Sequence, residues 1–396
     1  MTDTELTLGP LPTKRDDPFD PPTELRGRPP VSPLLFAGGA VGWLVTSYAE
    51  ARAVLTDPRF SADRSLAESP LRPVPTRFRQ RGTPPGMFNS MDPPLHTRYR
   101  KMLTGQFTVR RMKELEPRIE CIVSDTLQSM YDAHPPVDLV SSFALPVPMM
   151  VICELLGVPY EHRPEFQRIA AVLLNVESSV GQLMATVDEL REYMLRVVKM
   201  KRRTPDKALI SGLLSATDLS DEELINISQV LLLAGHETSA NMLGLGTFAL
   251  LQHPDEWNKL RAEPSLLPSA VEELLRYLTI AHMGPVRAAL EDIELAGITV
   301  RKGQTILVSL PLANRDPDLL EDGDTMNVAR TRTHHLAFGY GVHQCIGQQL
   351  ARVEMLIGFR QLLERFSDLR LAVDPSEVAM RSDMLVYGVH RLPVTW

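Results

Sequence analysis

One long apolar segment is the strongest structural signal in the chain: SDEELINISQVLLLAGHETSANMLGLGTFALLQHP, residues 220–254. It opens with a capping box, in which the Ser220 side chain accepts from the backbone N–H of Glu223 and the Glu223 side chain binds back. The apolar pattern then continues for roughly thirty residues until His253-Pro254 ends it, well beyond an average helix. A helix this long and this apolar is expected to lie buried in the middle of a large helical domain.

The flanking regions extend this picture to a mainly α chain with a small β portion. Residues 96–280 follow the helical period, whereas alternating stretches within 286–309 and the apolar run 41–46 predict short strands. Residues 65–95 are rich in Pro, Arg, Gly and Ser and are expected to form a long loop, and loops of this length are usually functional or disordered. The proline-rich start predicts an extended lead-in over residues 1–35.

Composition excludes several classes of protein. With 396 residues, a net charge of −7 and no internal repeat or linker, residues 1–396 are expected to form a single domain that does not bind nucleic acid. No uncharged apolar run approaches the ~20 residues of a membrane span, and no secretory signal opens the sequence. Three widely separated cysteines, Cys121, Cys153 and Cys345, argue against a disulfide framework and predict a reducing, cytoplasmic setting.

Cys345 differs from the other two cysteines in its surroundings, F-G-Y-G-V-H-Q-C-I-G at 338–347. Gly339 and Gly341 permit backbone conformations closed to other residues. Cys345 is expected in the first turn of the following helix, where free N–H groups and the helix dipole favour a thiolate. Gly347 would let a flat group approach closely. The plainer alternative is a buried structural cysteine.

A thiolate in this setting is a nucleophile or a metal ligand, and the neighbouring sequence narrows the choice. A zinc site needs further ligands, but Cys345 has no C-x-x-C partner, and the pair His236-Glu237 lacks a second histidine because position 240 is Ala. The C-x-x-C-H motif of covalent heme attachment is absent. A cysteine protease would recruit a His and an Asn from elsewhere, and that alternative stays open here. The pattern favours a cofactor held by a single thiolate.

Residues 338–347 resemble the heme-binding loop of the cytochrome P-450 superfamily, the heme-thiolate monooxygenases. Other stretches match in the family's order: A-G-H-E-T at 234–238, E-L-L-R at 273–276, N-R-D-P at 314–317 and H-L-A-F at 335–338. The resemblance reaches to the C-terminal L-P-V-T-W and is closest to the soluble actinomycete type. It implies the α-rich triangular heme-thiolate monooxygenase fold with a long central helix.

The resemblance also implies roles for individual residues. Cys345 would be the axial ligand to the iron of heme b (iron protoporphyrin IX), since a thiolate ligand favours O–O cleavage. Thr238 and Glu237 would deliver protons while O2 is activated, although a mid-helix Thr otherwise only bonds back to a carbonyl one turn earlier. The remaining heme contacts would be the propionate ligands His96, Arg100, Arg287 and His343, together with Phe338, Gly339, Gly347 and Ala234.

Glu273 and Arg276 share one helix face at spacing i, i+3. As an exposed pair they would contribute only a few tenths of a kcal/mol. The resemblance instead implies a buried structural pair beneath the heme loop, completed by Arg330. Met326 and Asn327 stand where the family usually has a Phe-Asp pair, a departure that leaves the oxygen and thiolate motifs intact.

The expected substrate is a hydrophobic organic molecule, because the residues that the resemblance brings to the pocket are mostly apolar and include flexible methionines. They are Met87, Phe88, Leu232, Leu233, Ile280, His282, Met283, Val286, Met384 and Leu385. Gly235 is expected to make room for a small ligand beside the long helix. Hydroxylation in secondary-metabolite biosynthesis or xenobiotic oxidation is expected. The alternatives are a peroxide-driven oxidase, an oxidative coupling enzyme and a non-enzymatic heme protein.

Electrons are expected from NAD(P)H through a ferredoxin reductase and a ferredoxin. Residues 96–113 hold six Lys or Arg and no Asp or Glu, a local excess in an acidic chain. This segment could be an ordinary solvated helix face. We interpret it as a docking surface for an acidic ferredoxin, whose approach would be steered by charge. A monomer without a membrane anchor is expected.

Overall fold

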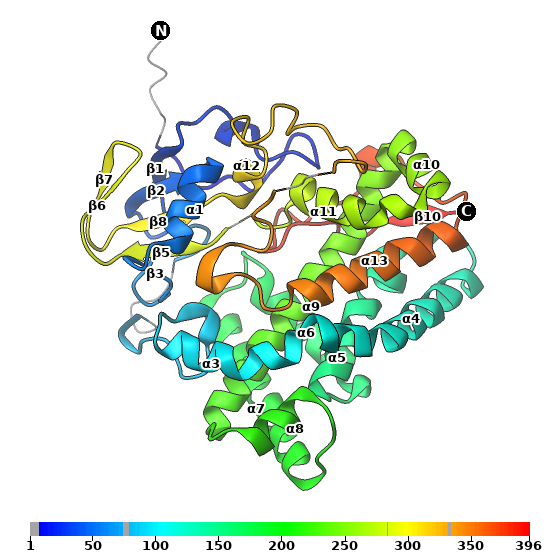
Figure 1. The fold of residues 1–396 in the computed structure, drawn as a ribbon, viewed down its shortest axis with the longest axis horizontal. Coiled ribbons are helices and arrows are strands. Elements are labelled where there is room, and N and C mark those ends of the chain that lie inside the picture. The colour runs from blue at the N-terminus through cyan, green and yellow to red at the C-terminus, as the bar shows by residue number, and fades with distance from the viewer. Residues whose placement is uncertain (1–7, 74–78, 283, 332–333) are drawn as a thin grey trace.

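The computed structural model describes residues 8–73, 79–282, 284–331 and 334–396 (Figure 1). Helix accounts for 53% of the chain and strand for 10%, which confirms a mainly α fold with a small β portion. The strands β1, β2, β3 and β5 to β8 gather on one side of the molecule, whereas most helices and β10 lie on the other (Figure 1). The outline is broadly triangular and narrows toward α7 and α8 (Figure 1).

The helices are α1 (Tyr48–Thr56), α3 (Leu95–Thr104), α4 (Val109–Asp132), α5 (Pro146–Leu156), α6 (Arg163–Leu174), α7 (Val180–Arg203), α8 (Leu209–Ala216), α9 (Asp221–Gln252), α10 (Pro254–Ala262), α11 (Leu267–Leu278), α12 (Leu310–Ala313) and α13 (Gln348–Arg365). The strands are β1 (Val31–Leu35), β2 (Val41–Val45), β3 (Phe60–Ser61), β4 (Val137–Asp138), β5 (Val286–Ala289), β6 (Ile293–Leu295), β7 (Ile298–Val300), β8 (Thr305–Val308), β9 (Arg370–Leu371) and β10 (Pro393–Thr395). Short turns join them, among them η4 (Val140–Ala144) and η7 (Gly341–His343).

The long helix is confirmed as α9, with 32 residues between the predicted cap and the predicted proline stop. Ser220 Oγ accepts from the Glu223 N–H at 3.2 Å, and a Glu223 carboxylate oxygen accepts from the Ser220 N–H at 2.8 Å. The helix packs against α5, α7, α11 and α13, so almost its whole circumference is covered. Between residues 224 and 250, only Ala234 and Thr238 are exposed.

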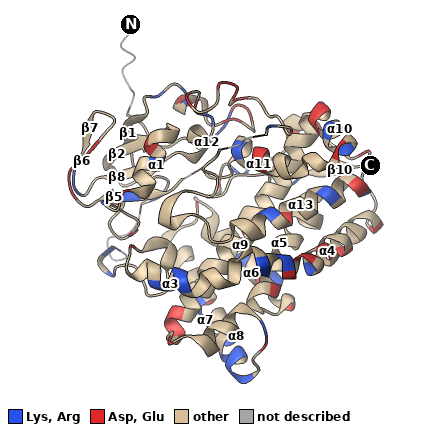
Figure 2. Ribbon diagram, viewed as in Figure 1, with Lys and Arg blue, Asp and Glu red and all other residues tan. Residues whose placement is uncertain are grey.

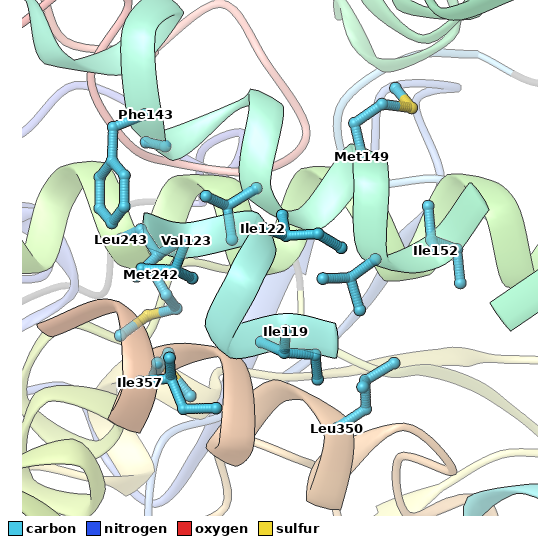
Figure 3. Packing of buried hydrophobic residues seen from close by; sticks show 14 of the residues in the cluster. Ile119, Ile122, Val123, Phe143, Met149, Ile152, Met242, Leu243, Leu350 and Ile357 are labelled. Atoms are coloured by element: carbon cyan, nitrogen blue, oxygen red, sulfur yellow. The ribbon is translucent and has the colours of Figure 1, made fainter. Parts of the chain in front are cut away.

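The core lies where α9 meets α4, α5, η4 and α13 (Figure 3). Small residues bring two of these helices close together, since a Cβ on Gly358 of α13 would lie 2.9 Å from Leu243, and one on Gly246 of α9 would lie 2.7 Å from Phe359. Side chains from all five elements interdigitate there: Ile119, Ile122, Val123, Phe143, Met149, Ile152, Met242, Leu243, Leu350 and Ile357. This packing holds α9 and α13 in a fixed relation.

A five-stranded sheet of order β1-β2-β8-β5-β3 forms the main β portion of the molecule. The strands predicted at 41–46 and within 286–309 are confirmed as β2 and as β5 to β8. The expected lead-in over residues 1–35 was too long, because residues 31–35 form β1 and pair antiparallel with β2. Pairing with a neighbour stabilises a strand that contains Pro33, which composition alone favours as irregular. Among the described residues, no helix is long and apolar enough to cross a membrane.

The cap of α9 is also tied to α3, and this predicts a pH-dependent contribution to stability. Burial alone would raise the pKa of Glu223, but hydrogen bonds from the Ser220 backbone, Arg98 and Tyr99 outweigh it and lower the pKa to about 2 from 4.5. The folded protein therefore binds fewer protons here, so the stabilisation is present above about pH 4.5 and is lost as the pH falls toward 2. We expect Glu223→Gln to lower the unfolding free energy at neutral pH by about 1–2 kcal/mol in urea titrations.

The matched control is Glu222→Gln, which alters the exposed neighbour in the same first turn. The difference between Glu223→Gln and the wild type should shrink as the pH falls through this range. Equal effects of the two substitutions, or a difference that does not depend on pH, would contradict the assignment.

Candidate active site

The loop before α13 owes its shape to two glycines. Gly339 and Gly341 have φ values of +70° and +71°, in the region that favours glycine. A Cβ on Gly341 would also lie 2.6 Å from the Leu55 carbonyl oxygen of α1. The chain therefore folds back tightly, and the Cys345 N–H donates to the Phe338 carbonyl at 2.8 Å.

Cys345 does not lie in the first turn of the helix, contrary to the prediction. The N-cap of α13 is Gly347 and the helix begins at Gln348, because the loop closes one residue after Cys345 and only then adopts helical geometry. Backbone N–H groups nevertheless act on the sulfur, as expected. Burial raises the pKa of the Cys345 thiol, while the N–H groups of Gly347 and Gln348 oppose this rise by donating to the sulfur.

A cavity of about 560 Å³ opens at Cys345 and reaches Thr238 of α9. A second cavity of about 210 Å³ shares with it Thr238, Phe338, Cys345 and Leu385. The Thr238 hydroxyl donates to the Ala234 carbonyl at 2.7 Å, and both residues are accessible although they lie in the middle of a buried helix. The open space beside Cys345 therefore faces the one break in the covering of α9.

Four basic side chains lie at or near this space: Arg287 and His343 line the larger cavity, His96 lies beside His343, and Arg100 lies within electrostatic reach of Cys345. The rings of His96 and His343 are 4.1 Å apart, and His96 Nδ1 is buried without a hydrogen-bond partner. No described carboxylate forms an ion pair with Arg100 or Arg287. The Arg287 guanidinium donates one described hydrogen bond, to the neighbouring Val286 carbonyl at 2.9 Å.

Burial shifts the pKa values of these groups. Burial first, and then Arg287, His96 and Arg100, lower the pKa of His343 to about 3. Burial likewise lowers the pKa of Arg287 to about 10. Such a cluster is costly unless anions neutralise it. A planar group with one thiolate-bound metal and two carboxylates, as heme has, fits these residues.

The other predicted heme contacts border the same space. Phe338 lines both cavities and Gly339 lines the larger. A Cβ on Gly347 would meet nothing nearer than the Cys345 sulfur, at 4.0 Å. Ala234 is exposed one turn before Thr238. Residues far apart in the sequence are thus brought to one place by α3, α9, β5 and the loop 338–347.

Gly235 does not make room for a ligand, as the sequence suggested. A Cβ at this position would lie 2.8 Å from Ile152 Cδ1, so Gly235 faces α5 and allows that helix to pack closely. The residue that faces open space is its neighbour Ala234. Successive side chains on a helix are rotated by about 100°. The orientation of α9 therefore decides that Ala234 faces the open space and Gly235 faces α5.

Glu237 is buried and has partners that the sequence does not reveal. Its carboxylate forms an ion pair with Arg381 at 2.9 Å, and Asn241 donates to the same oxygen at 3.3 Å. Arg381 comes from the C-terminal part of the chain and lacks any motif that marks it. In this arrangement the Glu237 side chain points away from the cavity that Thr238 borders.

Glu273, Arg276 and Arg330 lie together in the interior. Arg276 donates to both oxygens of Glu273 at 2.8 Å, both side chains are fully buried, and Arg330 Nε lies 3.2 Å from each oxygen. The Asn327 N–H donates to Glu273 at 2.9 Å, and Met326 is buried beside it. Met326 and Asn327 depart from the family pattern, but the Asn327 backbone still contacts the Glu273–Arg276 pair.

The predicted substrate-pocket residues that the structure describes separate into three groups. Val286 lines the larger cavity, Ile280 the smaller, and Leu385 both. Met87 and Leu233 pack, partly buried, against the core. Four others line neither cavity because they are buried in the interior: Phe88, Leu232, His282 and Met384. Met283 lies outside the described residues.

His282 was the polar candidate in that list. Its ring packs edge-on against Tyr387, with centroids 5.0 Å apart, and Nε2 lies 3.2 Å from the Arg381 carbonyl. It therefore supports the segment that carries Arg381. Sequence reasoning missed two residues that do line the larger cavity, Arg64 and Arg72. The arginine content of the loop 65–95 was the one available signal for them.

The basic segment 96–113 spans α3 and the start of α4, where Figure 2 shows basic residues along α3. Not all of its charge is available at the surface. Arg98 binds Glu223 and Asp218, whereas Arg110 and Arg111 bind Glu114. Lys101 and Lys113 are exposed. The surface charge is positive but smaller than the sequence count indicates.

Comparisons with known proteins agree with this site. The profile of the family described as "Cytochrome P450" matches residues 44–386. The chain is 45% identical to "Cytochrome P450-SU2" of Streptomyces griseolus over the whole of both proteins. It is 41% identical to "Vitamin D(3) 25-hydroxylase" of Pseudonocardia autotrophica over 94% of this chain and 92% of that protein. The crystal structure of CYP105P1 in complex with filipin I matches with a TM-score of 0.92 and 41% identity, over 98% of this chain and 99% of that one.

The fold is helical, and a cysteine loop faces its central helix. Together with the similarity to P450 relatives along the full chain, these features define the class as heme-thiolate proteins. The chain belongs to the cytochrome P450 family and is a monooxygenase. The family implies heme and O2-dependent monooxygenation.

Proposed function

We propose that this P450 inserts one oxygen atom of O2 into a hydrophobic organic substrate, most simply as a hydroxylation, within one domain. Electrons would come from NAD(P)H through a ferredoxin reductase and a ferredoxin, and the setting would be secondary metabolism or xenobiotic oxidation. The observation that carries the proposal is that Cys345 and Thr238 border the same cavities, and that the larger cavity is also lined by arginines that form no ion pair with a described carboxylate. The printed name of one relative, a 25-hydroxylase, supports hydroxylation.

When bound, heme with a thiolate ligand supplies the activation of O2 from which one oxygen atom enters the substrate. Cys345 would hold the iron, and the N–H groups of Gly347 and Gln348 would reduce the basicity of its sulfur. Phe338 borders the sulfur, and the Arg352 guanidinium lies 4.6 Å from the centre of its ring. That contact keeps the ring in place and excludes water from the ligand.

The four cations would bind the two heme carboxylates. Arg100 and His96 stand one turn apart on α3, whereas Arg287 and His343 come from β5 and from η7. Charge-assisted hydrogen bonds of this kind are the strong ones in proteins. They would fix the plane of the cofactor between Cys345 and α9.

Thr238 is the residue of α9 best placed to handle protons. Its hydroxyl hydrogen is directed to the Ala234 carbonyl, so the oxygen lone pairs remain free toward the cavity. A proton donor can therefore be held at Thr238 Oγ1. Glu237 would supply protons after its side chain exchanges Arg381 for water on the cavity side, since in this structure the two form an ion pair. Its partner Asn241 would remain as an anchor.

The first prediction concerns the ligand. The dithionite-reduced protein under carbon monoxide should show a strongly red-shifted Soret band, because a thiolate lies opposite the gas. Cys345→Ala should abolish this band, whereas Cys121→Ser and Cys153→Ala should retain it as matched controls. Absence of heme from protein expressed with sufficient heme, or a shifted band that persists without Cys345, would refute the proposed function.

The second prediction concerns proton delivery. Thr238→Ala should lower the product formed per NADH by about tenfold and divert the remainder to hydrogen peroxide, since a positioned proton donor is lost. Turnover would be measured with a compound selected by the spin-state change it causes. Thr238→Ser should retain most of the yield.

The control for this experiment is Thr247→Ala on the same helix, because Thr247 also donates to a carbonyl one turn earlier but is buried in the core. Unchanged product per NADH in Thr238→Ala would contradict the role of Thr238 in proton delivery.

The third prediction concerns the ferredoxin. Reversal of Arg110, Arg111 and Lys113 to Glu should slow the first electron transfer about tenfold or more at low salt and less at high salt, because screening weakens steering. Stopped-flow reduction under carbon monoxide measures this rate. Arg301→Glu with Lys302→Glu, on the exposed turn between β7 and β8, is the control. Equal rates in both variants would place the docking surface elsewhere.

A further inference from the structure

The larger cavity carries more positive charge than two heme carboxylates require. In addition to Arg287 and His343, it is lined by Arg64 and Arg72. Both belong to the segment between β3 and η2 (Phe88–Ser90), on the part of the cavity wall that also includes Asn89. The question is what these two arginines bind.

Arg64 has no described partner. No hydrogen bond or ion pair joins it to another described residue. Its side chain is accessible because it faces the cavity, yet protein encloses it on the other sides, so burial lowers the pKa of its guanidinium. An enclosed cation that forms no ion pair is costly, whereas the fully buried Arg276 is paired with a carboxylate.

Arg72 is held in place but is not neutralised. Its two terminal nitrogens donate to the carbonyls of Leu173 and Asn175 at 3.3 Å, beyond the end of α6. Like charges add to the cost, since Arg64 lowers the pKa of both Arg72 and Arg287. These repulsions show that Arg64 lies within electrostatic reach of both.

The cavity wall offers no acid to balance them. Glu68 is the one described carboxylate among the lining residues, and Arg79 binds both of its oxygens. The rest of the described lining is largely apolar: Leu55, Ala62, Val286, Leu310, Ala337 and Leu385. An apolar space with two unneutralised guanidinium groups on one wall matches a molecule with an apolar body and an anionic end.

We propose that the substrate of this enzyme is an amphipathic carboxylate, whose anionic group is bound by Arg64 with Arg72 while its apolar body extends toward Thr238 and Cys345. Guanidinium groups bind carboxylates through paired, parallel hydrogen bonds, which would also orient the substrate. The proposal rests on the proposed function and specifies its substrate class. It assigns Arg64 to the substrate and leaves the heme carboxylates to His96, Arg100, Arg287 and His343.

The test uses azole probes that bind the heme iron directly and therefore report on this cavity whatever the natural substrate is. One series comprises ω-(imidazol-1-yl)alkanoic acids of increasing chain length, and the second comprises their carboxamides, which match them in shape but lack the charge. Each dissociation constant is read from the red shift of the Soret band at neutral pH. In the wild type, the acid should bind about tenfold or more tightly than its amide at the chain length that reaches Arg64.

The variants assign the preference to residues. Arg64→Gln should reduce the acid-to-amide ratio to about one, and Arg64→Glu should invert it, because the anion then meets a carboxylate. Arg72→Gln should reduce the ratio in part. The control is Arg301→Gln, which removes an equal charge from an exposed ion pair with Asp292 and should leave the ratio unchanged.

Each contrary result overturns a defined statement. Acids and amides that bind equally at every chain length in the wild type would overturn the carboxylate proposal while the proposed function stands. A preference that survives in both Arg64→Gln and Arg72→Gln would overturn the assignment of these residues. Loss of bound heme from Arg64→Gln would show that Arg64 binds a heme carboxylate instead. A protein without the red-shifted carbon monoxide band would refute the proposed function itself, and the substrate proposal with it.

Discussion

The burial of α9 is the constraint on which the rest of this structure depends. A helix of 32 residues that is apolar on every side is stable in water only when other elements cover it on every side. α5, α7, α11 and α13 do so, and close contacts at Gly246 and Gly358 leave little freedom in their positions. The covering is interrupted at Ala234 and Thr238. The open space of the site follows from that interruption, and the packing that surrounds it holds Cys345 opposite.

Electrostatics separate the scaffold from the site. In the scaffold, the fully buried Arg276 is paired with Glu273, and its other terminal nitrogen donates to the carbonyls of Asn314 and Gly323 at 3.1 and 2.6 Å. Removal of one member of such a pair would leave an uncompensated buried charge. In the cavity, by contrast, Arg64 and Arg287 form no ion pair with a described carboxylate, and burial lowers the pKa values of Arg287 and His343. The charge of Arg276 is thus neutralised within the protein, whereas the arginines at the cavity form no ion pair with a described carboxylate and can accept anionic ligands.

Glu237 belongs to the site motif but is paired like a charge of the scaffold. It belongs to the segment 234–238, which the proposed function assigns to oxygen activation, yet here it is as thoroughly paired as a structural residue. Its partner Arg381 is held by the C-terminal segment, whose backbone contacts His282. A movement of this segment would therefore change the availability of the acid on α9, and Leu385 of the same segment lines both cavities. The acid and the substrate cavity share one supporting segment.

The sequence by itself determined the elements whose stability is local. The limits of α9 follow from its capping box and from Pro254, the strands at 41–45 and 286–308 from alternation, and the loop 338–347 from glycines that must adopt positive φ. Each depends on residues a few positions apart. Tertiary structure alone decided that Gly235 faces Ile152 while Ala234 faces the cavity, and that Cys345 precedes its helix. It also decided which apolar residues pack in the core and which line the cavity, and it brought Arg381 to Glu237 and Arg64 to Arg72. These relations depend on how segments distant in the chain pack against one another, and neither periodicity nor local motifs carry that information.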